Sequence, residues 1–100
     1  MIKINIEKKD NNKIEKIYIK GHALFAESGK DIVCAAVSST VITTVNNILS
    51  LSKTIDYIES KDGLTIIVIK DDEVTQKLLN NMLSMLEELE RDYSKYIKIF

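Results

Sequence analysis

The sequence predicts an α+β fold: a two-layer ββαββαβ domain in which a mixed or antiparallel sheet carries two helices on one face. Three observations predict it. Alternating apolar residues mark strands near both ends, two long segments repeat apolar residues every three or four positions, and 100 residues is the size of one domain. The chain has no proline and no linker-like stretch, so we expect one domain over residues 1–100.

The first 20 residues predict a β-hairpin. Residues 2–7 alternate, with Ile2, Ile4 and Ile6 on one side and polar residues on the other. The polar segment KKDNNK supplies turn chemistry, and a second alternating run, IEKIYIK, follows at 14–20.

Residues 31–52 predict a helix, although their many Val, Ile and Thr residues favour strands. Apolar side chains recur every three or four residues, and a 22-residue strand would be implausibly long. The stripe consists of Val33, Val37, Val41, Val45 and Ile48. Asp31 is expected to be the N-cap, because its short carboxylate can accept a hydrogen bond from an amide two or three residues on.

The second half repeats this order. The runs 54–59 and 64–70 flank Asp62-Gly63, a strong hairpin signal, and the second run is apolar on both faces, which predicts a central strand. Acidic residues 71–73 then open a second helix, where the macrodipole favours them. Its predicted apolar stripe is Val74, Leu78, Met82, Met85, Leu86, Leu89 and Tyr93. Ile97 and Ile99 predict a short final strand.

Two helices cannot cover both faces of this sheet. The face away from them is expected to carry apolar side chains, including Ile67 and Ile69. Burial of such a face favours self-association, so a homodimer is expected.

Charge and composition exclude several classes of protein. A net charge of −1 argues against binding to nucleic acid or an anionic membrane, and acidic residues interrupt the lysines near the start. One cysteine and one histidine cannot form a disulfide or a structural zinc site, so no metal or cofactor is expected. No targeting segment precedes the fold and no apolar run approaches about 18 residues, which predicts a cytoplasmic protein.

The only histidine and the only cysteine are the candidate catalytic pair. His22 follows the strand 14–20, and Cys34 lies in the first turn of the next helix, so both are expected at the same edge of the sheet. If Asp31 is the N-cap, Cys34 is at N3, where free amides and the macrodipole favour a thiolate by about 0.3–1 kcal/mol. A protonated imidazole would favour the thiolate more strongly.

The residues around this pair suit thiol chemistry. The amide of Ala35 is a candidate donor to an oxyanion, and the small side chains of Ala35 and Ala36 leave space beside the sulfur. Gly21 and Gly29 are candidate hinges of the intervening loop, which is then a candidate gate over a peptide. Asp31 could also orient His22.

Less specific interpretations remain open. A lone cysteine among Val and Ala residues is usually a small buried hydrophobe, and the chain would then be a non-catalytic dimeric interaction module. A lone histidine after a strand is more often a surface residue. Ser38 either contacts a substrate or bonds back to a helix carbonyl. A thiol redox sensor is disfavoured, because the chain has no resolving cysteine.

The run GHALFAESGKDIVCAAVSS, residues 21–39, resembles the signature of the ribosomal-processing cysteine protease family Prp, and the similarity extends along the chain. The resemblance implies a homodimeric α+β protease with Cys34 as nucleophile and His22 as base, and with Asp31 and Ser38 at supporting polar positions. It also implies the substrate, a large-subunit ribosomal protein (the bacterial twenty-seventh) whose short N-terminal extension is removed after an aromatic pair.

Overall fold

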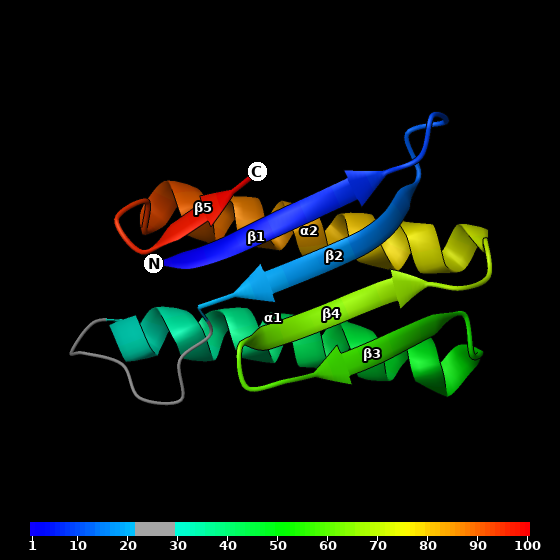
Figure 1. The fold of residues 1–100 in the computed structure, drawn as a ribbon, viewed down its shortest axis with the longest axis horizontal. Helices are drawn as coiled ribbons and strands as arrows, with labels where there is room; N and C mark the ends of the chain where they lie inside the picture. The colour runs from blue at the N-terminus through cyan, green and yellow to red at the C-terminus, as the bar shows by residue number, and fades with distance from the viewer. Residues whose placement is uncertain (22–29) are drawn as a thin grey trace.

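The computed structural model describes residues 1–21 and 30–100, with the backbone alone at Lys30 and Asp31. In this part of the chain five strands form one sheet, and both helices lie against the same face of it (Figure 1). This confirms the predicted two-layer α+β fold. The elements in chain order are β1 (Ile2–Lys8), β2 (Ile14–Lys20), α1 (Lys30–Leu51), β3 (Ile55–Glu59), β4 (Gly63–Val68), α2 (Glu73–Asp92) and β5 (Ile97–Ile99).

The strand order is β3-β4-β2-β1-β5. Neighbouring strands are antiparallel except β1 and β5, which are parallel, so the sheet is mixed. β4 lies between β3 and β2, as its two apolar faces predicted. The short β5 pairs beside β1 and confirms the final strand.

The hairpin between β3 and β4 turns one residue earlier than predicted. Ser60 and Gly63 exchange backbone hydrogen bonds of 2.8 and 3.3 Å, so Lys61 and Asp62 are the turn residues and Gly63 opens β4. A Cβ atom on Gly63 would run into the carbonyl oxygen of Ile19 on β2. The glycine is therefore needed for the close approach of two backbones, and not for the turn alone.

α1 packs its predicted stripe against the sheet. Its five stripe residues are all at most 2% exposed: Val33, Val37, Val41, Val45 and Ile48. Hydroxyl groups on the same helix bond back to the carbonyl four residues earlier, as in Thr40 to Ala36 at 2.8 Å and Thr44 to Thr40 at 2.9 Å. These bonds satisfy the hydroxyl groups locally, so a helix rich in threonine forms despite its β-propensity.

One property of α1 was missed by the sequence analysis. The segment Ile32–Leu51 contains no charged residue, and its mean hydropathy of 1.6 is high enough, over this length, for a helix that crosses a membrane. No continuous apolar run reaches that length, as expected, because serine, threonine and asparagine residues interrupt the segment without adding charge. About a third of the segment is buried within the domain, and its buried residues include the stripe that packs against the sheet.

α2 begins as predicted, and its predicted stripe is confirmed only in part. Asp72 is its N-cap and accepts a hydrogen bond from the Val74 amide at 3.0 Å. Met82 and Leu86 are buried as predicted, whereas the other apolar side chains of the stripe, except Tyr93, line the groove between α2 and α1 and do not pack on the sheet. The buried residues are Thr75, Gln76, Leu79, Met82 and Leu86, whereas Val74, Met85 and Tyr93 are exposed and Leu78 and Leu89 are half-buried.

A buried glutamine connects α2 to the first hairpin. The Gln76 Oε1 accepts from the Ile14 amide, and its Nε2 donates to the Ile14 carbonyl, both at 2.8 Å. Gln76→Leu is expected to lower the free energy of unfolding by about 1–3 kcal/mol for each backbone group left unsatisfied, measured by urea unfolding. Asn80→Ala, one turn away on an exposed residue, should stay within about 0.5 kcal/mol of the wild type. Equal stabilities of the two variants would contradict this role of Gln76.

An ion pair connects the β1–β2 turn to the segment before α2. Lys13 Nζ donates to Asp71 Oδ2 at 2.8 Å, and this hydrogen bond lowers the pKa of the Asp71 carboxyl. The carboxylate therefore stabilises the fold above an ordinary Asp pKa of about 3.9, and the contribution is lost as the pH falls through the lowered folded-state value. Lys13→Gln should raise the Asp71 pKa in an NMR titration, whereas Lys77→Gln on α2 should leave it unchanged. An unchanged pKa in Lys13→Gln would refute the assignment.

Candidate active site

Gly21 holds the end of β2 against the start of the chain. Its φ of 79° is left-handed, and a Cβ atom here would press on the Met1 carbonyl oxygen. Both facts require glycine. The close packing holds the turn at Gly21 in one conformation. The role of Gly21 as a hinge stays a prediction. His22 and Gly29 lie outside the described residues.

The start of α1 corrects two predictions. The helix begins at Lys30, so Asp31 is in its first turn and is not the N-cap, and Cys34 lies in the second turn rather than at N3. The apolar period fixed the face of the helix but not its first residue. In a helix that begins here, the i→i−4 pattern directs the amides of Cys34 and Ala35 to the carbonyls of residues 30 and 31. The amide of Ala35 is thus used by the helix, while the amides of residues 30–32 have no helical carbonyl partner among the described residues of α1.

Cys34 is a free thiol at the margin of the core. It is 5% exposed and belongs to the same buried cluster as Val33 and Val37. A Cα–Cβ bond in a helix tilts toward the helix N-terminus, so the Cys34 side chain leans toward the first turn of α1 and its free amides.

Ser38 lies one turn after Cys34 and is bonded to it. The Ser38 hydroxyl donates to the Cys34 carbonyl oxygen at 2.7 Å. Back-bonding to the helix, one of the two predicted roles of Ser38, is therefore observed, and a contact with a substrate stays a prediction. Such a bond steadies the backbone of the cysteine without contacting its sulfur.

The end of β2 and the first turns of α1 lie close to one end of the molecule, as the topology predicted, whereas the approach of His22 to Cys34 stays a prediction. The end of β2 leads into His22, and the first turns of α1 carry Cys34 (Figure 1). Among the described residues, no group of three or more His, Cys, Asp or Glu side chains could hold a metal ion. The local chemistry is that of a single thiol near a helix start.

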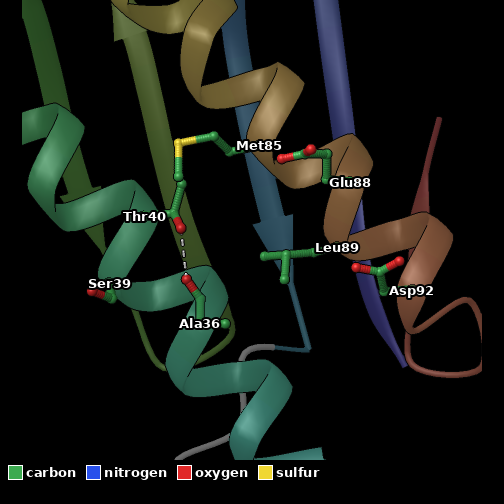
Figure 2. Close-up of a pocket in the computed structure, with 7 residues that line it drawn as sticks. All are labelled: Ala36, Ser39, Thr40, Met85, Glu88, Leu89 and Asp92. Atoms are coloured by element: carbon green, nitrogen blue, oxygen red, sulfur yellow. Dashed lines mark hydrogen bonds between the residues drawn. The ribbon is translucent and has the colours of Figure 1, made fainter.

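A cavity that the sequence analysis missed lies between α1 and α2. It has a volume of about 390 Å³ and is lined by Ala36, Ser39, Thr40, Met85, Glu88, Leu89 and Asp92 (Figure 2). Residues two apart on a helix lie about 200° apart around its axis, so Ala36 and this cavity are on the other side of α1 from Cys34. Ala36 therefore opens space toward α2 and not beside the sulfur. Met85 is the residue that indicates the cavity, because it is 46% exposed although the predicted stripe placed it in the core.

Comparison with known proteins decides the chemistry. The family model of the cysteine protease Prp matches residues 1–98. The chain belongs to the Prp family of cysteine proteases. The ribosomal processing cysteine proteases Prp of Staphylococcus aureus and Bacillus subtilis are 31% and 32% identical to it over 103 and 113 aligned residues. Each comparison covers 99% of this chain, and 97% and 96% of the respective relative.

Solved structures agree with the family assignment. The S. aureus Prp in complex with a substrate peptide superposes with a TM-score of 0.93 at 28% identity, covering 100% of this chain and 98% of that one. The same protease with a covalently linked product peptide superposes with a TM-score of 0.88 at 29% identity, covering 99% and 97%. The chain thus has the Prp fold and belongs to a family of cysteine proteases, which hydrolyse peptide bonds.

Proposed function

We propose that this Prp protein removes the short N-terminal extension of a large-subunit ribosomal protein, the bacterial twenty-seventh, by cutting after an aromatic pair. The observation that carries the proposal is the full-length match, at a TM-score of 0.93, to a ribosomal processing protease bound to a substrate peptide. The placement of Cys34 at the start of α1, beside the end of β2, supports it. We assign the activity to one domain over residues 1–100, acting in the cytoplasm without metal or cofactor.

The mechanism is acyl transfer by a cysteine–histidine pair. His22 takes the Cys34 proton, and the thiolate attacks the carbonyl carbon of the scissile bond. Free amides in the first turn of α1 are the proposed donors to the oxyanion, in place of Ala35. The C–N bond then breaks as His22 protonates the leaving amine. Water, giving a proton to His22, hydrolyses the thioester, which releases the new carboxylate and restores Cys34.

Two further residues act through this pair. Asp31, in the first turn of α1, is the proposed positioning residue for the His22 ring. Ser38 is the proposed support of the Cys34 backbone through its hydrogen bond of 2.7 Å. Neither needs to contact the substrate.

The test uses the extended ribosomal protein and measures its mass after incubation with the purified enzyme. We expect a single new mass, at the value for cleavage after the aromatic pair, and no cleavage when alanines replace that pair. If the wild-type enzyme leaves the extended protein intact but cuts another peptide, the protease chemistry stands and this substrate is wrong.

We also propose that the protein is a homodimer joined through α1. The sequence analysis placed the interface on the sheet face with Ile67 and Ile69, but Ile67 is half-buried and the neighbouring positions of that face are largely polar. The exposed apolar side chains gather instead on α1, where Ile32, Ile42 and Leu49 are 67%, 43% and 43% exposed. An uncharged helix face of this kind is typical of an interface.

Sedimentation of the wild-type protein at micromolar concentration should give a dimer, and Ile42→Glu with Leu49→Glu should give a monomer. The matched double variant Ile58→Glu with Ile69→Glu, at exposed residues of the β3–β4 hairpin region, should stay dimeric. A monomeric wild type would refute the dimer, and a dimeric α1 variant would refute this interface.

A further inference from the structure

The face of the sheet away from the helices carries a row of three lysines. The strand register pairs Lys3 with Lys20 on β2 and with Lys98 on β5. Residues directly opposite each other on neighbouring strands point to the same face, so all three side chains project from the uncovered face, and all three are exposed. With strands about 4.8 Å apart, their Cα atoms fall within about 10 Å.

The charge of this row is not neutralised within the described residues. The three ion pairs found there join Lys13 to Asp71, Lys16 to Glu7, and Lys77 to Glu73, none of which belongs to the row. Like charges directly opposite each other on a sheet destabilise it. A fold that keeps three such neighbours side by side is therefore arranged to meet a negatively charged partner.

An aromatic residue lies on the same face, beside the row. Tyr18 is half-buried on β2, two residues from both Lys16 and Lys20. Its cross-strand neighbours are Asn5 and Thr65, whose side chains are smaller than the tyrosine ring. β2 is the central strand of the sheet (Figure 1). Tyr18 on this strand therefore lies near the middle of the open face.

The open sheet face is basic and the helical layer is acidic, although the net charge of the whole chain is only −1. The open sheet face carries four lysines and two carboxylates, and one of the carboxylates, Asp56, lies on the edge strand β3. These residues are Lys3, Lys16, Lys20 and Lys98, with Glu7 and Asp56. The helical layer is acidic, since α2 carries five carboxylates and two basic residues: Glu73, Glu87, Glu88, Glu90 and Asp92 against Lys77 and Arg91. The sequence-based exclusion of nucleic acid assumed interspersed charges, but strand alternation and register sort them onto separate faces.

We propose that this open face binds single-stranded RNA, with the lysine row on neighbouring phosphates and a base stacked on Tyr18. Sheets that bind single-stranded RNA combine cationic side chains for the backbone with exposed aromatic rings for the bases. A membrane surface fits less well, because the basic clusters that recognise anionic lipids lie beside a transmembrane helix or on an amphipathic helix, whereas this face is a β-sheet. The choice of RNA over DNA rests on the proposed ribosomal function, and the site would hold the enzyme at RNA-bound substrates.

The test measures binding of a fluorescein-labelled 12-nucleotide RNA of mixed sequence by anisotropy, at 50 and 200 mM salt. Three phosphate contacts at about −0.7 each predict a log–log salt slope near −2 and a loss of affinity of about 20-fold between these concentrations. Lys3→Gln, Lys20→Gln and Lys98→Gln together should abolish most binding and flatten the slope. Lys53→Gln, Lys70→Gln and Lys77→Gln together carry the same charge change away from this face and should bind within about twofold of the wild type.

Substitutions at Tyr18 separate stacking from charge. Tyr18→Ala should weaken binding about tenfold, whereas Tyr18→Phe, which keeps the ring, should bind as the wild type does. Cleavage of a short peptide, measured in parallel, should be unaffected in the lysine-row variant, so loss of RNA binding is distinguished from failure of the protease proposal.

Three results would overturn the RNA site. The first is no RNA binding by the wild type, and the second is equal losses in the two triple-lysine variants, which would indicate net charge alone. The third is binding to phosphatidylserine vesicles without binding to RNA, which would assign the face to a lipid surface. Should the lysine-row variant fail to fold, Lys20→Gln alone must reduce the salt slope by about 0.7 for the proposal to stand.

Discussion

Replacement of Cys34 by alanine is expected to abolish peptide cleavage while leaving the domain folded. The thiolate is the atom that forms the covalent intermediate, and no other cysteine in the sequence can replace it. Removal of one sulfur atom from the margin of the core is a small change in volume, so the thermal unfolding temperature should fall by only a few degrees. The measurement is kcat/KM on a peptide that spans the cleavage site.

The matched control is Thr44→Ala on the same helix. Its hydroxyl bonds back to the Thr40 carbonyl at 2.9 Å, more than two turns after Cys34, so its loss should leave kcat/KM within about twofold. Residual cleavage by Cys34→Ala above the uncatalysed rate would show that the thiol is not the nucleophile.

His22→Gln is expected to reduce kcat about 10²–10⁴-fold, the usual contribution of general acid–base catalysis. Glutamine keeps a polar side chain of similar size but cannot take the Cys34 proton. In the double variant with Cys34→Ala, the losses should not add, because the two residues act as one unit. A loss in KM with kcat unchanged would instead make His22 a residue for substrate binding.

Most of the fold follows from local pattern. Alternation predicted both hairpins, and the period of the valines predicted the buried face of α1, because these signals depend only on which side chains meet the sheet. The predicted face of α2 failed at Val74 and Met85, which are 49% and 46% exposed. The apolar period of a helix does not determine whether its apolar side packs on a sheet or lines a groove beside another helix.

The placement of the elements around the candidate site was predicted, whereas the pairing of His22 with Cys34 stays a prediction. The order of elements placed the end of β2 and the start of α1 at one edge, and this follows from topology. The first residue of α1 did not follow, because the period of Val33 and Val37 continues equally well from Lys30 or Asp31. The lysine row could not be predicted either, because the positions opposite Lys3 depend on strand register, which brings together Lys20 and Lys98 from distant parts of the chain.

The central claim is that Cys34 and His22 form a catalytic pair, and the rate of Cys34 alkylation by iodoacetamide near pH 6 tests it most directly. Location alone does not distinguish a catalytic thiol from a structural one, because Cys34 is only 5% exposed. A thiolate paired with His22 should react quickly at this pH, and the His22→Gln variant should react at least about tenfold more slowly. Slow alkylation at the same rate in both proteins would contradict the catalytic pair and make Cys34 a structural residue of the core.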